Sequence, residues 1–211
     1  SPKGVVDLTS PPQCGQRWFL ATHGLGFKLF PMCYGAHRAL DGIFTLLSAH
    51  PFKADDVDVI EVHATQLQLT NLVHENPQGG LDAKFSMEFA MAAPIIAGRV
   101  TEAEFTQEFV QRSDLRALLA RVRRVIQPPL EKGAPFRDKI VVHLRDGRVF
   151  EQALQIPMGH ADRPPTPEAL WVKFLDCVGD ALTPAEARRM FDQLQNLDHL
   201  ASVHDLPLAK V

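Results

Sequence analysis

The stretch "KIVVHLRDGRVFEQALQI", residues 139–156, decides the fold class of this 211-residue chain. Two extended runs stand on either side of Asp146-Gly147, a pair that is favoured in the type I′ turns of β-hairpins. Upstream, "VDVIEVHAT" at 57–65 is rich in β-branched residues, which predicts a strand buried on at least one face. The run "RRVIQ" at 123–127 is a further candidate strand. We therefore expect a β-sheet that includes the hairpin.

Helical patterns fill the sequence around these strands. Residues 36–49 carry apolar side chains at helical spacing. Ser86 is a candidate N-cap for an apolar helix over 86–97, and Gly98 is a stop signal for it. Further helix starts are predicted at Thr101, which forms a capping box with Glu104, and at Ser113. Strands and helices mixed in this way predict an α+β fold.

The chain divides into three segments. Residues 1–16 are polar and rich in proline, and we expect a linker that follows something upstream. Residues 17–157 are expected to form a small α+β domain, and residues 158–211 a C-terminal helical segment with helix starts at Thr166 and Thr183. Both C-terminal helices have an apolar stripe that must be covered. The cover is either the α+β domain or a helical domain outside this chain.

Composition argues against several functions. Charged residues make up 22% of the chain, the net charge is −3, and no Lys/Arg cluster indicates a nucleic-acid surface. No apolar run approaches the roughly 20 residues that span a bilayer. The three cysteines, Cys14, Cys33 and Cys177, are far apart and odd in number, which favours a reduced, cytoplasmic protein. No spacing of Cys or His indicates a metal site.

The first candidate site lies in "GFKLFPMCYGAHRALDGIF" at 26–44, and we call residues 28–37 the first bend. Residues 17–30 are expected to be extended up to Pro31, and Lys28 lies near the end of this run, where it could meet a substrate carboxylate or, if desolvated, act as a base. His37 falls in the first turn of the predicted helix, which favours a neutral ring suited to acid–base chemistry. Tyr34 and Cys33 share this turn. The alternatives are a solvated lysine, a histidine that packs locally and a structural cysteine.

The second candidate site lies in "LDAKFSMEFAMAAPIIAGRV" at 81–100, and we call residues 84–89 the second bend. Lys84, the Ser86 hydroxyl and the free N–H groups of the helix start together could bind an anion. The alternative is ordinary capping by Ser86 beside a solvated Lys84. Our hypothesis is that both bends face one pocket for a small acidic metabolite.

Both bends resemble the MmgE/PrpD family, which comprises 2-methylcitrate dehydratases, cis-aconitate decarboxylases and iminodisuccinate epimerases. "KLFPMCYGAHRALDGIF" is similar to the family's Lys-aromatic-Pro turn with its following Cys and His, and is closest to the epimerase-like branch. "AKFSMEFAMAAPIIAGRV" is similar to a Lys/Arg-Phe/His-Ser-x-x-Tyr segment that opens a helix. "DGRV" and "LWVKFLDC" extend the likeness over about residues 24–205. It covers only about the C-terminal half of a family member.

The resemblance implies that residues 17–157 form a small lid-like domain, and that the helices after it pack on a separate N-terminal helical domain. It also implies cofactor-independent removal of a proton alpha to a carboxylate of a small di- or tricarboxylate, leading to dehydration, epimerisation or decarboxylation. Lys28 matches the family's turn lysine and His37 its histidine, so both are expected to be catalytic. The residues expected to bind substrate are Lys84, Ser86, Phe89 and Tyr34.

One departure separates this chain from the family. Phe89 stands where the family usually has tyrosine, and a phenyl ring cannot donate a proton or a hydrogen bond. The reaction therefore differs from that of the named members, or another residue takes this role.

Our leading hypothesis is that the chain is part of a cytoplasmic, homodimeric enzyme and is inactive without the other half of that enzyme. The enzyme is expected to be a lyase (a hydro-lyase similar to 2-methylcitrate dehydratase) or an isomerase. The alternative is a non-catalytic remnant of the lid domain that serves as a binding or interaction module. A stand-alone hydrolase has no support, because no Ser-His-Asp or nucleophile-elbow pattern is present.

Overall fold

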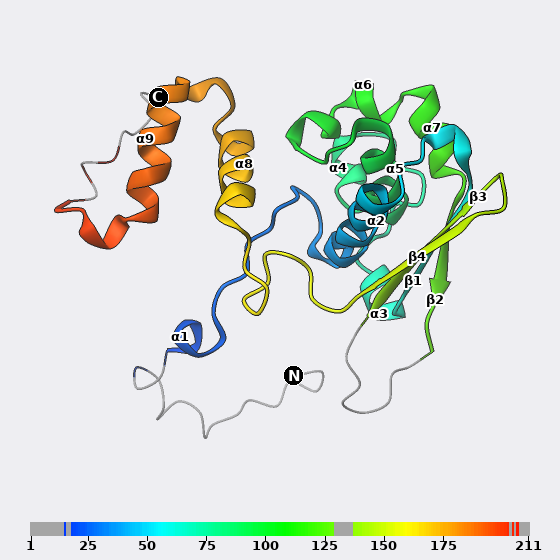
Figure 1. Cartoon of the computed structure of the whole chain (residues 1–211), viewed down its shortest axis with the longest axis horizontal. Helices are drawn as coiled ribbons and strands as arrows, with labels where there is room; N and C mark the ends of the chain where they lie inside the picture. The colour runs from blue at the N-terminus through cyan, green and yellow to red at the C-terminus, as the bar shows by residue number, and fades with distance from the viewer. Residues whose placement is uncertain (1–14, 16–17, 129–136, 203, 205, 207–211) are drawn as a thin grey trace.

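The described part of the chain has a mixed α+β structure, as predicted. The computed structural model describes residue 15 and residues 18–128, 137–202, 204 and 206. Nearly all of the predicted linker, residues 1–16, and Cys14 with it, lies outside the described residues. Figure 1 shows a body in which a sheet and several helices pack together, with the last two helices to one side.

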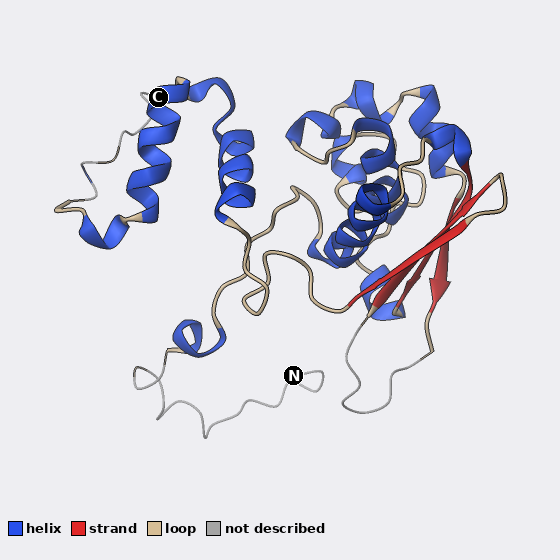
Figure 2. Cartoon of the chain, viewed as in Figure 1, coloured by secondary structure: helices blue, strands red, loops and turns tan. Residues whose placement is uncertain are grey.

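The sheet has the strand order β2-β1-β3-β4 within the described residues (Figure 2). The interior strand β1 (Val57–Ala64) runs parallel to β2 (Val122–Ile126) and antiparallel to β3 (Asp138–Leu144). Strand β4 (Val149–Leu154) pairs antiparallel with β3 and completes the hairpin. The predicted strands and the predicted hairpin are confirmed.

The turn of the β3–β4 hairpin differs from the predicted type I′ turn. The N–H of Leu144 donates to the carbonyl of Arg148 (2.9 Å), and the N–H of Gly147 donates to the carbonyl of Leu144 (3.0 Å), so the loop has three residues. A type I′ turn needs a positive φ at both central residues. Gly147 has φ of 89°, but no described residue other than glycine has a positive φ, so Asp146 does not meet this condition. The prediction of the turn type was therefore wrong.

Two helices, α2 (His37–Ala49) and α5 (Met87–Ala97), pack against the sheet and against each other (Figure 2). Helix α2 comes close to β3 at Gly42, where an added methyl group would collide with the side chain of Ile140. Apart from Glu88, helix α5 carries only apolar residues, and it is buried from Met87 to Pro94. As predicted, α5 begins at an Ser86 cap and ends at Gly98, whose φ is 69°.

The other helices of the body are short and lie in its connections. Their bounds are Gln66–Leu69 (α3), Gly80–Ala83 (α4), Gln107–Val110 (α6) and Ser113–Leu119 (α7), with 3₁₀ turns at Tyr34–Ala36, Ala54–Asp56 and Glu102–Phe105. The predicted capping box is present, because Glu104 accepts a 2.8 Å hydrogen bond from the Thr101 N–H. The expectation that residues 17–30 are extended was wrong in part, since Phe19–His23 form the helix α1.

The C-terminal helices α8 (Pro167–Val178) and α9 (Pro184–Gln195) begin at the predicted threonine caps, and 3₁₀ turns follow at Gly179–Ala181 and Leu197–His199. The two helices pack on each other: the ring of Phe191 lies 5.0 Å from that of Trp171 and 5.4 Å from that of Phe174. No residue of α8 is fully buried, and Val172 is 63% exposed. The apolar stripes therefore cover each other in part, and α8 keeps an open face. Among the described residues, no helix combines the length and apolar character that crossing a bilayer requires.

Candidate functional site

A backbone hydrogen bond joins the two bends. The N–H of Cys33 in the first bend donates to the carbonyl of Lys84 in the second, at 2.9 Å. Helices α2 and α5, which start at these bends, also pack against each other. The two stretches, about fifty residues apart in the sequence, thus lie in one region of the fold. Their side chains nevertheless have very different surroundings.

His37 is fully buried at the start of α2. Its ring lies 5.4 Å from that of Phe30 and 5.0 Å from that of Tyr34, and neither ring nitrogen makes a hydrogen bond of good geometry. The pKa of His37 is lowered to about 4, chiefly by burial; the positive charges of Lys28 and Lys173 act in the same direction, and the nearby backbone opposes them. His37 is therefore a neutral imidazole at physiological pH, as expected at this position.

Lys28 and Tyr34 are the accessible members of the first bend. Lys28 is exposed, and its charge is close enough to His37 to affect the pKa of that ring. Tyr34 is 38% exposed, and partial burial raises the pKa of its phenol above the usual value. A phenol with a raised pKa keeps its proton at neutral pH and can donate it in a hydrogen bond.

In the second bend, by contrast, the polar side chains already have partners within the chain. The Lys84 Nζ donates to both carboxylate oxygens of Glu102, at 3.0 and 2.9 Å, and lies over the ring of Phe105. The fully buried Ser86 hydroxyl accepts a hydrogen bond from the Phe89 N–H (3.1 Å) and donates to Glu88 (3.3 Å). An anion would have to compete with Glu102 for Lys84, and Ser86 acts as a helix cap.

Phe89 packs in the core. Its ring is fully buried and lies 5.1 Å from the ring of Phe105 and 6.1 Å from that of Phe109. This position gives Phe89 a packing role. The prediction that Phe89 binds substrate finds no support in it, because the side chain has no surface to offer a ligand.

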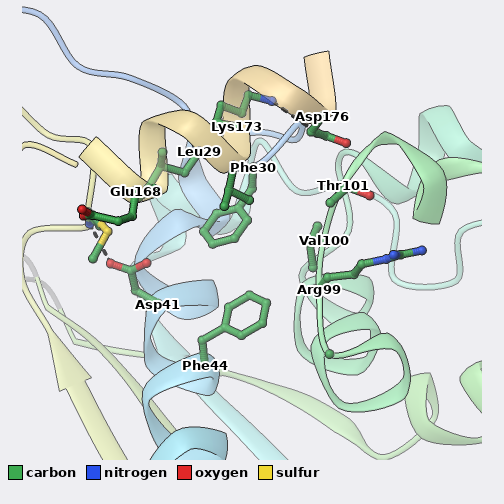
Figure 3. A pocket seen from close by; sticks show the side chains of 14 residues that line it. Leu29, Phe30, Asp41, Phe44, Arg99, Val100, Thr101, Glu168, Lys173 and Asp176 are labelled. Atoms are coloured by element: carbon green, nitrogen blue, oxygen red, sulfur yellow. Dashed lines mark hydrogen bonds and ion pairs between the residues drawn. The ribbon is translucent and has the colours of Figure 1, made fainter. Parts of the chain in front are cut away.

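A cavity of about 450 Å³ lies near the first bend, between α2, the segment after α5 and α8 (Figure 3). Figure 3 shows the rings of Phe30 and Phe44 in this space, with α8 across it and the charged groups toward its edge. The lining residues are Leu29, Phe30, Asp41, Phe44, Gly98, Arg99, Val100, Thr101, Met158, Glu168, Ala169, Val172, Lys173 and Asp176. None of the six predicted site residues is among them, so this cavity is not the pocket that the hypothesis placed between the two bends.

Sequence reasoning missed a polar network beneath the start of α2. Arg38 lies 3.1 Å from the buried carboxylate of Asp138 and donates to Gln68 at 2.8 Å, and Gln68 donates to Asp138 and to the carbonyl of Gly35. Burial raises the pKa of Asp138 despite the opposing charge of Arg38. The network fixes the 3₁₀ turn that leads into His37. Its members are far apart in the sequence, and no local pattern points to it.

No group of three or more His, Cys, Asp and Glu side chains in the described part of the chain is arranged to hold a metal ion. The described cysteines, Cys33 and Cys177, are both free thiols.

Comparisons with known proteins cover this region of the chain. A family model described as the MmgE/PrpD C-terminal domain matches residues 30–199, which include both helix starts and α8 and α9. Cis-aconitate decarboxylase of Mus musculus is 25% identical over 166 residues, which cover 74% of this chain and 33% of the relative. The chain thus spans about a third of the length of this curated relative. Because the family model covers most of the sequence, this chain belongs to the MmgE/PrpD family, whose C-terminal domain it contains.

Proposed function

We propose that this chain is the C-terminal part of a cofactor-independent enzyme that removes a proton alpha to a carboxylate of a small di- or tricarboxylate. The observation that carries the proposal is a buried, neutral His37 beside the positive charge of Lys28, in a chain of the MmgE/PrpD family. The mouse relative, named as a cis-aconitate decarboxylase, supports a tricarboxylate substrate. Since the chain spans about a third of that relative, further residues of a larger enzyme complete the site, and the chain alone does not turn over.

In this proposal, Lys28 binds a substrate carboxylate and His37 is the base. A pKa of about 4 makes His37 a weak base in the free protein. A bound polycarboxylate brings negative charge next to the ring, which favours the imidazolium and raises its pKa toward neutrality. His37 has no exposed surface, so the rings of Phe30 and Tyr34 that lie against it must shift to admit the substrate.

The reaction begins when His37 accepts the alpha proton and the electrons of the broken C–H bond move into the adjacent carboxylate. The ammonium of Lys28 stabilises the resulting enolate-like dianion. In dehydration, the β-hydroxyl then leaves as water with a proton from the Tyr34 phenol; in epimerisation, a proton returns to the opposite face of the same carbon. In decarboxylation, His37 returns its proton to the enolate-like intermediate; CO₂ then departs, the electrons of the broken C–C bond stay on carbon, and that carbon takes up a second proton from solvent. The proposed class is therefore a lyase or an isomerase.

The second bend supplies a further anion site in this proposal. Lys84 would exchange Glu102 for a second substrate carboxylate, while Ser86 keeps the N-terminus of α5 in place. Breaking the Lys84–Glu102 pair costs little free energy, because the pair is partly exposed and such pairs contribute about 1 kcal/mol or less to stability.

Calorimetric titration of the 211-residue chain with citrate and cis-aconitate tests the binding part of the proposal. We expect Lys28→Met to weaken binding about tenfold, the effect of losing roughly 1.4 kcal/mol from one charge-assisted contact. Lys53→Met is the matched control, because Lys53 is exposed beyond the opposite end of α2. Equal binding by Lys28→Met and wild type would remove the role of Lys28. The catalytic part is tested by assaying the chain alone and joined to an MmgE/PrpD N-terminal domain, where full turnover by the chain alone would contradict the partial-enzyme reading.

A second candidate function is a non-catalytic binding or interaction module. In the second bend, Lys84 is already paired with Glu102 and Ser86 already caps α5, and this favours the binding or interaction module. This function predicts no heat of binding with either acid, together with a stable complex between this chain and an MmgE/PrpD N-terminal domain.

A further inference from the structure

The segment that leads to Lys28 is attached to the loop between β4 and α8. Residues 24–28 form no strand, yet the N–H of Phe27 donates to the carbonyl of Gly159 at 2.7 Å. Figure 1 shows the two segments crossing beneath α8. We call residues 24–28 the arm and residues 156–163 the clamp loop. The bonded residue, Phe27, directly precedes Lys28 in the chain, so this hydrogen bond holds the arm at the position of Lys28.

The clamp loop is shaped for this contact. Gly159 has φ of 93°, a conformation that costs other residues energy, and an added methyl group would collide with the carbonyl of Phe27. On the other side of the contact, a methyl group added at Gly24 would come within 2.8 Å of the Cβ of Ala161. The arm and the clamp loop therefore approach as closely as glycine allows at two successive points.

Asp41 attaches the clamp loop to α2. Its Oδ2 accepts hydrogen bonds from the Met158 N–H (2.6 Å) and from the Arg163 Nη1 (2.7 Å). The same Arg163 nitrogen donates to the carbonyl of Ile156 at 2.9 Å, and the Arg163 carbonyl accepts from the Gly159 N–H at 2.9 Å. Asp41 is only 9% exposed, whereas the Arg163 side chain is 39% exposed, so these charge-assisted bonds are shielded from water on the Asp41 side.

Asp41 stands four residues after His37, so the two side chains leave the same side of α2 one turn apart. A continuous path of contacts thus runs from the helix that carries His37, through Asp41, Arg163 and Gly159, to the arm that carries Lys28. We propose that Asp41, Arg163 and Gly159 are positioning residues that hold Lys28 at a fixed place relative to His37. This inference rests on the proposed roles of Lys28 and His37, but the geometry of the path can be tested without them.

The first test uses NMR on the 211-residue chain. In the wild type, the Phe27 amide is expected to exchange slowly with solvent. In Gly159→Ala and Arg163→Met, it is expected to exchange at least tenfold faster, because the methyl group displaces the arm and the lost guanidinium frees the loop. Gly179→Ala is the matched control: it has a positive φ of 51° but nothing within 4 Å of the added methyl group. It should leave the Phe27 amide unchanged.

The second readout is the titration of the His37 ring in the same samples. The charged groups that act on His37 are Lys28 from the arm and Lys173 from α8, with the backbone at Met32 and Phe30 acting in the opposite sense. If the clamp is lost, Lys28 moves away and the His37 titration shifts upward from about 4, whereas Lys173 still acts. Arg163→Lys keeps the positive charge next to Asp41 and should restore part of the wild-type behaviour, which a general loss of stability would not do.

The outcomes separate this inference from the proposed function. Unchanged Phe27 exchange and an unchanged His37 titration in both Gly159→Ala and Arg163→Met would overturn the positioning role, whatever the chain binds. If Gly159→Ala does not fold, Arg163→Met and Asp41→Asn decide by the same criteria. Failure of the wild type to bind either acid would instead overturn the proposed function and leave the clamp intact. With turnover established, Arg163→Met should lower kcat by up to roughly 100-fold, the effect of a misplaced catalytic group.

Discussion

The first and second bends share a pattern, a basic residue before a helix that packs in the core, but they differ in what their polar groups do. In the first bend, His37 is buried without a good hydrogen bond, and Lys28 is exposed. In the second, Ser86 caps α5 and Lys84 is paired with Glu102. Polar groups that lack partners inside the protein are costly and are often kept for function, whereas satisfied groups stabilise the fold. The first bend is thus the stronger candidate for chemistry and the second for stability.

The largest effect that tests this comparison is expected at Phe89. Phe89→Ala removes a fully buried ring that packs on Phe105 and Phe109, and should lower the free energy of unfolding by about 3–5 kcal/mol. Urea denaturation followed by circular dichroism measures it. Phe27→Ala is the control, because Phe27 is 53% exposed and should lose far less. A loss below about 1 kcal/mol for Phe89→Ala would show that the second bend is not structural.

The pH dependence of stability probes the first bend. The pKa of His37 is about 4 in the folded protein and 6.5 in a free side chain, so the unfolded chain binds the proton more readily. The neutral ring's contribution is complete above pH 6.5, and it is lost as the pH falls from 6.5 to 4. Over this range, the expected loss is roughly 3 kcal/mol. Denaturation at several pH values should show this slope in the wild type, and His37→Gln should flatten it. An equal slope in both proteins would contradict the burial of a neutral His37.

Ser86→Ala is expected to have a moderate effect. It removes the acceptor for the Phe89 N–H at the start of α5, which should cost about 1 kcal/mol. Thr166→Ala at the start of α8 is the matched control, since Thr166 caps the Ala169 N–H in the same way on a helix with no buried residue. We expect the Ser86 variant to unfold at lower denaturant and the Thr166 variant to change less. Equal effects would mean that the cap is worth the same whether or not its helix is buried.

These features differ in how far the sequence predicts them. The cap at Ser86, the stop at Gly98 and the strand of 57–64 depend on neighbouring residues, and local patterns identified them correctly. The type of the hairpin turn was missed because Asp146-Gly147 fits more than one loop length, and the number of residues in the loop depends on how the strands pair. Helix α1 was missed because its five residues carry no helical apolar pattern.

The site was predictable only as two separate stretches. Sequence patterns located His37 and Ser86 at helix starts. The hydrogen bond between the Cys33 N–H and the Lys84 carbonyl, by contrast, results from tertiary packing. The pairing of Lys84 with Glu102 and of Asp41 with Arg163 joins residues that are 18 and 122 positions apart. No local rule indicates such partners. The sequence therefore could not predict that the polar groups of the second bend have partners within the chain while, among the described residues, His37 and Lys28 of the first bend make no hydrogen bond of good geometry.

The smallest expected effect sharpens the comparison, because it asks whether the second bend is closed only by Glu102. Glu102→Gln removes the negative charge that holds Lys84, and the pair is partly exposed, so the stability should change by less than about 1 kcal/mol. The freed ammonium can then meet an anion, and citrate affinity should rise about two- to fivefold in calorimetric titration at low salt.

Glu108→Gln is the matched control, because this exposed carboxylate lies on α6 and makes no ion pair among the described residues. Unchanged citrate affinity in Glu102→Gln, together with a loss in Lys28→Met, would restrict anion binding to the first bend. Lys84 would then serve stability alone, through its contact with the ring of Phe105 and its backbone bond to Cys33. A gain in Glu102→Gln would instead show that both bends can bind the same acid, with Glu102 as the internal competitor that keeps the second bend closed.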